Sequence, residues 1–137
     1  MQYCYFGSRW GDKSKPLLSI FCKYNIAFAG LDSKEEVDKN KFKAGTKIAI
    51  TDGLTIKAVG IAEEDFDSLD NLGINFLPEE QDNFSVNNSV LAVKVKLFKL
   101  REEDWFQYEA ALKRFQSIDS RKDIKDKIDE LIEKYLR

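Results

Sequence analysis

The chain has 137 residues, of which 43% are hydrophobic and 12% aromatic, which is enough for one domain with a buried core and excludes a disordered tail. Its formal net charge is −2 and it contains no histidine, which excludes Ser–His and Cys–His nucleophile pairs and histidine metal sites. No run approaches the roughly 18 apolar residues of a membrane span, and no basic-then-apolar leader opens the chain, so we expect a cytoplasmic protein without a membrane partner.

The charges are distributed unevenly along the chain. Residues 1–60 carry ten Lys or Arg against six Asp or Glu, residues 61–101 four against eight, and residues 102–137 eight against ten. A non-specific nucleic-acid binder is usually basic overall, so this chain can present at most a basic face. Its two cysteines, Cys4 and Cys22, are too few for a disulfide scaffold or a four-ligand zinc site. We expect buried free thiols, and neither a metal nor a cofactor.

The first forty residues predict short elements around one loop. Residues 2–6 form an aromatic strand candidate, which ends at the glycine that opens a loop over 7–12. Ser and Pro near the start of 14–23 predict a short helix there. Residues 24–30 are typical of a buried strand closed by glycine, and 32–41 of a charged, solvated connection.

Residues 43–63 predict a β-hairpin, with Asp52-Gly53 as its two-residue loop. In the first arm, alternation places Ile48 and Ile50 on one face and Lys47, Ala49 and Thr51 on the other. In the second arm, it sets Thr55, Lys57, Val59 and Ile61 against Leu54, Ile56 and Ala58. Gly60 inside this arm predicts a bulge or a close approach of two backbones.

The segment that follows is acidic, and we expect a long excursion over 63–88 with at most one short strand near 74–77. Its acids do not match the calcium-binding EF-hand pattern. Residues 89–100 predict a second strong strand, in which Leu91, Val93, Val95 and Leu97 share one face while Lys94, Lys96 and Phe98 share the other.

The C-terminal part has helical spacing. Glu102 to Asp104 would form an acidic first turn, followed by an apolar stripe of Trp105, Tyr108, Leu112 and Phe115. Ser120 would cap a final helix with a stripe of Ile124, Ile128, Leu131, Ile132 and Tyr135. We expect both stripes to dock on the sheet, with a partner surface as the alternative.

No catalytic motif is present. None of the glutamates is followed two places on by lysine, as magnesium-dependent nuclease cores require, and neither phosphate-binding glycine motif occurs. What remains is aromatic and polar surface of the kind that reads a single-stranded or flipped base. We therefore predict no catalytic residues, and a ligand site made of Arg9, Trp10, Tyr24, Asn25, Phe28 and Asp52.

The order of these elements resembles the PUA-like superfamily, in particular its EVE-type domains. The resemblance rests on the aromatic first strand, the Arg9-Trp10 loop, the strand ending in Phe28-Ala29-Gly30, the Asp-Gly hairpin returning through Val59-Gly60-Ile61, and the segment Phe115 to Ile118. It implies an α+β fold, a small bent β-barrel with flanking helices over 1–118. Residues 119–137 would form a C-terminal helix that packs on the barrel or leads to a further domain.

The resemblance also implies a function. EVE-type domains are similar to YTH readers and to modified-base modules of bacterial restriction systems. The expectation is a non-catalytic module, in a defence or restriction context, that binds nucleic acid or a nucleobase-like ligand. Its pocket would lie between Arg9-Trp10, the Tyr24–Phe28 strand and the turn at Asp52. The alternative is a protein-interaction or regulatory domain whose C-terminal helices dock a partner or a second copy of the chain, as in a homodimer.

Overall fold

The structure is a computed structural model that describes residues 2–10, 15–30, 42–86, 91–118 and 120–137. The connection predicted over 32–41 lies outside the described residues. The strands are β1 (Tyr3–Gly7), β2 (Arg9–Trp10), β3 (Lys15–Pro16), β4 (Ile26–Ala29), β5 (Lys47–Asp52), β6 (Thr55–Ala62), β7 (Leu91–Lys99), β8 (Phe106–Gln107) and β9 (Phe115–Ser117). The helices are α1 (Leu18–Tyr24), α2 (Leu69–Leu72), α3 (Pro78–Gln81), a 3-10 turn at Glu102–Asp104 and α4 (Lys122–Leu136).

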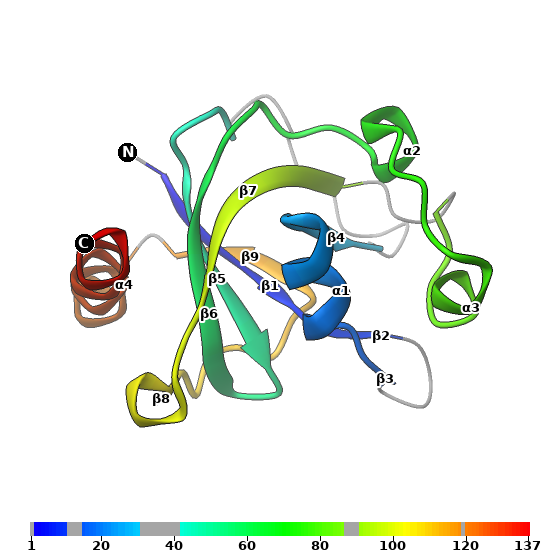
Figure 1. The fold of residues 1–137 in the computed structure, drawn as a ribbon. Coiled ribbons are helices and arrows are strands. Elements are labelled where there is room, and N and C mark those ends of the chain that lie inside the picture. The colour runs from blue at the N-terminus through cyan, green and yellow to red at the C-terminus, as the bar shows by residue number, and fades with distance from the viewer. Residues whose placement is uncertain (1, 11–14, 31–41, 87–90, 119) are drawn as a thin grey trace.

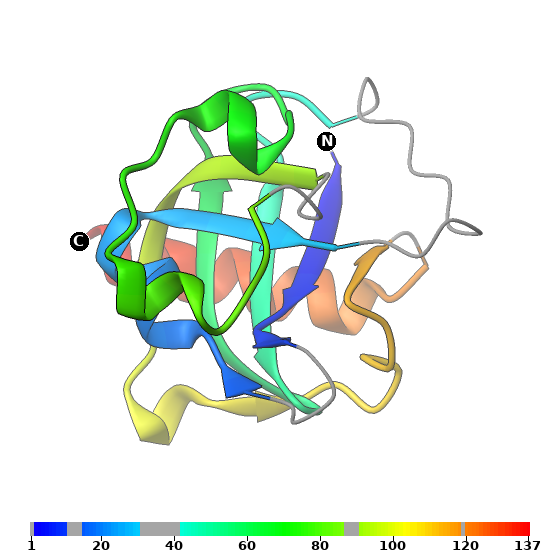
Figure 2. The ribbon, with the colours of Figure 1, turned by 90° about the vertical axis from the view of Figure 1, so that its right-hand side faces the viewer.

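One curled sheet organises the described chain. Its strands run in the order β4-β7-β6-β5-β1-β9, with β8 paired to β6, while β2 and β3 form a separate small ribbon. Neighbours are antiparallel except β1 and β5, which are parallel. The sheet wraps around α1, and α4 lies outside it (Figures 1 and 2). The fold is therefore mixed α/β with a strongly curled, half-barrel sheet.

The sheet curls because strand β7 pairs with a different neighbour along each half of its length. Its first part, Leu91 to Lys94, pairs with β4, whereas Val95 to Lys99 pairs with β6. A Cβ atom added to Gly60 of β6 would lie 2.5 Å from the Lys96 carbonyl oxygen and 2.5 Å from Val95 Cγ1. The close backbone approach predicted at Gly60 is thus confirmed, because only glycine lets the two paired strands lie this close together.

The predicted hairpin is also confirmed, with two corrections. β5 runs to Asp52 and β6 begins at Thr55, so the connecting residues are Gly53, at φ +63°, and Leu54 instead of Asp52-Gly53. The bulge lies at Lys57, because Ile50 pairs with Ala58 and the next residue of β5 pairs with Ile56. This extra residue moves Ile56 to the same face as Val59, against the predicted alternation.

The inner face of the sheet encloses the larger core. Ile48, Ile50 and the predicted inner face of β7 point inward, toward α1 and a cluster of aromatic rings. Much of this aromatic cluster comes from the acidic segment 63–86, which was predicted to be a solvated excursion. Its Phe66, Phe76 and Phe84 are each only 7% exposed. No strand forms over 74–77; α2 and α3 carry the segment across the open side of the sheet instead.

The outer face is covered by α4. The predicted stripe is confirmed, since Ile124, Ile128, Leu131 and Ile132 are buried against Tyr5, Ala49 and Val59 of the sheet. The predicted Ser120 cap is wrong, because Arg121 precedes the first turn and its side chain makes no capping bond. The stripe that could have served a dimer is thus used inside the chain.

The helix predicted over 102–115 does not form. After the 3-10 turn the chain makes β8, a loop and β9. Of the predicted stripe, Leu112 is 81% exposed, Tyr108 joins the outer core and Phe115 the inner core. The four residues of the stripe have helical spacing, but two are exposed to solvent and the other two lie in different cores. Tertiary packing therefore overrides the local pattern.

Near the N-terminus the predicted loop over 7–12 is partly a ribbon, because Arg9 and Trp10 pair with Pro16 and Lys15. Proline is tolerated in such an edge strand, where its missing N–H is not needed. The helix therefore begins later than predicted, at Leu18. Asn25 ends it in the left-handed conformation (φ 53°), which shortens the predicted strand to Ile26–Ala29. No helix in the described ranges is long and apolar enough to cross a membrane.

We predict that Gly60→Ala lowers the free energy of unfolding by about 1–3 kcal/mol, since its methyl group would overlap β7. The matched control is Gly7→Ala, whose Cβ would meet its neighbours at 3.5 Å, an ordinary contact distance. Urea denaturation measures both. Equal stability of the two variants would contradict the close approach of β6 and β7 at Gly60.

We predict that Ile128→Ala, which empties a fully buried position under α4, costs about 2–5 kcal/mol. Leu136→Ala, in the same helix but 50% exposed, should change stability by less than about 0.5 kcal/mol. The same denaturation experiment compares them. A small effect of Ile128→Ala would contradict the packing of α4 on the outer face of the sheet.

Candidate functional site

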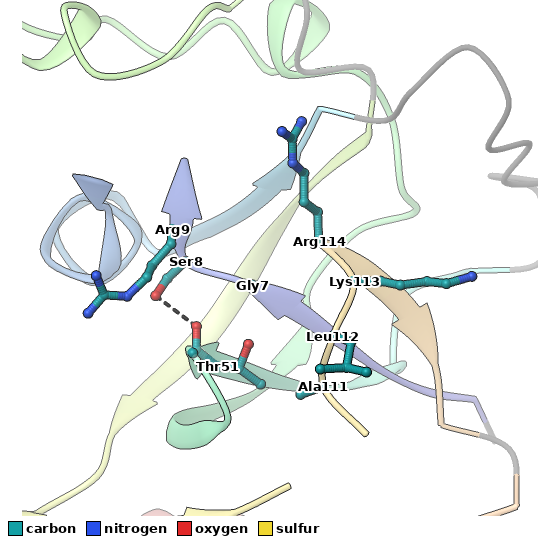
Figure 3. A pocket seen from close by; sticks show the side chains of 9 residues that line it. Gly7, Ser8, Arg9, Thr51, Ala111, Leu112, Lys113 and Arg114 are labelled. Carbon is teal, nitrogen blue, oxygen red and sulfur yellow. Dashed lines mark hydrogen bonds between the residues drawn. The ribbon is translucent and has the colours of Figure 1, made fainter. Parts of the chain in front are cut away.

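An open recess of about 160 Å³ lies where β1 and β5 end, beside the turn of the hairpin. It is lined by Gly7, Ser8, Arg9, Thr51, Gly53 and the segment 111–114 that leads into β9 (Figure 3). Segments from three separate parts of the chain therefore meet around one surface hollow. We call it the recess.

The floor of the recess is held by short hydrogen bonds. Both the backbone N–H and the hydroxyl of Ser8 donate to the carbonyl oxygen of Thr51, at 2.8 Å each. The Gly7 N–H donates to the Arg114 carbonyl oxygen at 2.8 Å. Ser8 and Thr51 are each 1% exposed. These bonds fix the relative positions of β1, β5 and the segment before β9, so the floor is rigid.

Three cations stand around this floor: Arg9, Lys113 and Arg114, which we call the basic rim. All three are exposed, and their side chains spread from the recess in different directions (Figure 3). The Arg114 guanidinium donates to the Gly30 carbonyl oxygen at 3.2 Å, which links it to the end of β4. Within the described part of the chain, no carboxylate pairs with Lys113. The rim gathers three cationic side chains at one place on a chain whose net charge is −2.

One carboxylate connects the rim to a fourth cation. Asp52 accepts from Arg9 Nε at 2.5 Å and from Lys57 Nζ at 2.6 Å. Its side chain is only 12% exposed. Burial by itself raises the pKa of Asp52, but the hydrogen bonds from Lys57 and Arg9 outweigh it and hold this pKa below its usual value. Asp52 therefore stays ionised and keeps both cations at the end of the hairpin.

Of the predicted ligand residues, the structure brings Arg9 and Asp52 together. The side chain of Trp10 lies outside the described part of the structure; its backbone belongs to β2. Phe28 is fully buried, with ring centroids 4.8 Å from those of Phe21 and Phe84, so it serves the core and cannot line a surface pocket. This part of the predicted aromatic pocket is corrected.

Tyr24 and Asn25 lie apart from the Arg9–Asp52 pair. The Tyr24 hydroxyl bonds the Glu80 carboxylate of α3, which also accepts from Lys23 at 3.0 Å. The bond to Glu80 raises the pKa of Tyr24. Asn25 is exposed and ends α1. These contacts tie α1 to α3, and they give Tyr24 a structural role at the opposite end of the aromatic cluster from the recess.

Both cysteines are free thiols, as predicted. Cys4 is fully buried in the inner core, and burial raises its pKa well above the usual value. Cys22 is partly buried, and burial raises its pKa as well. A thiol with a raised pKa is a poor nucleophile, so neither residue extends the site.

The basic residues of segment 111–114 were not predicted as site residues. A helix was predicted over this region, and Lys113 and Arg114 were given no role. The sequence gives little sign of where these two residues lie. They come just before β9, which has only three residues, and a strand so short shows no clear alternation. The residues matter through their position beside β1, which only the fold reveals.

The comparisons with known proteins add no assignment. The sequence matches no model of a known protein family, and a search of curated proteins finds no similar sequence.

We predict that Asp52→Asn lowers the free energy of unfolding at pH 7 by about 1–2 kcal/mol, since two cations lose their carboxylate. A carboxyl whose pKa is lowered by folding stabilises the protein above its unfolded pKa, and this contribution disappears as the pH falls through the folded pKa. The difference from wild type should therefore be constant near neutrality, decrease once the pH falls below about 4, and vanish at lower pH.

Chemical denaturation between pH 7 and pH 2 measures this difference. Glu63→Gln, which removes an exposed carboxylate outside the recess, is the matched control and should show no comparable loss. A difference between Asp52→Asn and wild type that is independent of pH would contradict the charged role of Asp52.

Proposed function

We propose that the protein is a non-catalytic module that binds nucleic acid, and that the recess contacts the phosphate backbone. The observation that carries the proposal is the basic rim, in which Arg9 of β2 and the consecutive Lys113 and Arg114 before β9 meet at one hollow. Lysine and arginine supply most of the affinity for nucleic-acid phosphates through counterion release. A floor held by hydrogen bonds, with exposed cations around it, suits a backbone whose phosphates repeat regularly.

The curled sheet is compatible with the PUA-like, EVE-type resemblance, which adds a modified base as the finer ligand class and a defence or restriction system as the context. The alternative was a homodimer formed through the C-terminal helices. It is not supported, because the apolar stripe of α4 is buried against the sheet of the same chain. Buried stripes do not offer a partner surface.

The test is a fluorescence-anisotropy titration with labelled single-stranded and duplex oligonucleotides, with and without modified bases, at several salt concentrations. We predict that Lys113→Ala/Arg114→Ala weakens binding at least about tenfold in low salt. The dependence of log K on log salt should become shallower by about 0.7 per lost phosphate contact with a single strand.

The matched control is Lys122→Ala/Lys127→Ala, which removes the same number of cations from an exposed and a half-buried position of α4. It should bind as wild type does. Failure of every oligonucleotide to bind below about 100 μM in low salt, or equal weakening by both double variants, would end the proposal.

A further inference from the structure

The end of the molecule that holds the recess also exposes apolar side chains. Of the five large hydrophobic residues that are exposed in the described part, three belong here: Leu54 at the hairpin turn (41% exposed), Trp105 before β8 (36%) and Leu112 on the recess (81%). The Tyr108 N–H donates to the Leu54 carbonyl oxygen at 2.7 Å, which attaches the β8 segment to the hairpin turn. β8, the hairpin turn and the β2–β3 ribbon lie along the same edge of the molecule in both views (Figures 1 and 2). Clustered exposed apolar groups indicate a binding surface.

The Trp105 indole is held in a defined position. Its Nε1–H donates to the Leu100 carbonyl oxygen at 3.2 Å, and Lys57 Nζ lies 4.3 Å from the centre of the ring. Both contacts restrain the ring while more than a third of the residue stays accessible. An indole fixed in this way costs little further entropy when it receives a flat ligand.

A continuous row of side chains joins this ring to the recess. Lys57 Nζ lies over Trp105 and 2.6 Å from Asp52, and Asp52 lies 2.5 Å from Arg9, which lines the recess. The order is therefore the indole, Lys57, the mostly buried Asp52 carboxylate, Arg9 and then the recess. Leu54 and Leu112 border the hairpin turn along this row.

From this order we infer that the preferred ligand is single-stranded nucleic acid, with an unpaired base stacked on Trp105 and the adjoining phosphates on Lys57, Arg9 and Lys113. The inference rests on the proposed function and adds the strandedness of the ligand and its stacking residue. A duplex hides the faces of its bases, so it could use the cations but not the indole. Alternating aromatic and cationic side chains are the usual means of holding a single strand.

The test compares three ligands of about 12 nucleotides: an oligothymidylate, an abasic strand with the same phosphates, and a duplex. Trp105→Leu should weaken binding of the oligothymidylate by about 5- to 100-fold, because it removes the stacking surface but keeps an apolar side chain. Binding of the abasic strand and the duplex should be unchanged. Trp105→Phe, which keeps an aromatic face, should restore most of the affinity.

Two further controls separate the outcomes. Leu77→Ala, an exposed apolar position on the far α3 side, should leave binding of the oligothymidylate unchanged, and circular dichroism checks that each variant is folded. If Lys113→Ala/Arg114→Ala weakens binding while Trp105→Leu does not, the inference is wrong and the proposed function stands. If no oligonucleotide binds, both fail.

The same apolar and basic surface could instead meet an anionic membrane, so vesicles of phosphatidylcholine with phosphatidylserine are included. Loss of vesicle binding in Trp105→Leu, with the affinity for the oligothymidylate unchanged, would overturn the inference. Wild-type protein that binds the oligothymidylate but not the vesicles supports it.

Discussion

The close approach of the paired strands β6 and β7 at Gly60 is the constraint on which the rest of the structure depends. A side chain there would meet the backbone of β7 at 2.5 Å, so the two strands can approach only because β6 carries none at this point. The approach lets β7 leave β6 and continue beside β4, and the sheet closes halfway around its own interior. A flat sheet of the same strands would not enclose the aromatic cluster of α1 and segment 63–86, and those rings would be exposed to solvent.

The curl sets two packing requirements, one on each side of the same strands. Inside, large rings from distant parts of the chain fill the space, because the inner positions of β6, such as Ala58 and Ala62, are small. Outside, polar contacts hold α4 at its middle and near its C-terminal end. The Tyr3 hydroxyl and Lys47 Nζ donate to Asp129, and the Tyr135 hydroxyl donates to Asp104 at 2.7 Å. With both faces covered, the hairpin turn and the strand ends beside it remain open to a ligand.

What could be predicted from the sequence was what depends on near neighbours. The hairpin, the inner face of β7 and the stripe of α4 all follow from regular alternation or helical spacing. The failures lie where long-range packing decides. Phe66, Phe76 and Phe84 show no common period and are buried only because the sheet curls toward them. The spacing of Trp105 and Phe115 imitates a helix, although one ring lies at the surface and the other in the inner core.

The site divides in the same way. Arg9 and Asp52 were predicted together because each lies beside a turn that the sequence marks with glycine. Phe28 was misplaced because a buried ring and a ligand-binding ring look the same in a sequence. Lys113 and Arg114 were missed because their position depends on β9 pairing with β1, a contact between residues more than a hundred apart.

Charge and geometry together explain how an acidic chain can carry the proposed function. One carboxylate oxygen of Asp52 accepts from Arg9 and the other accepts from Lys57. Asp52 therefore holds two cations beside the recess but neutralises only one of their two charges. The second positive charge stays beside the recess, where it acts within about one Debye length, roughly 8–10 Å. Phosphate contacts of this kind do not discriminate between sequences. Any discrimination must therefore come from the aromatic and apolar side chains next to the rim, which are the groups that the fold leaves uncovered there.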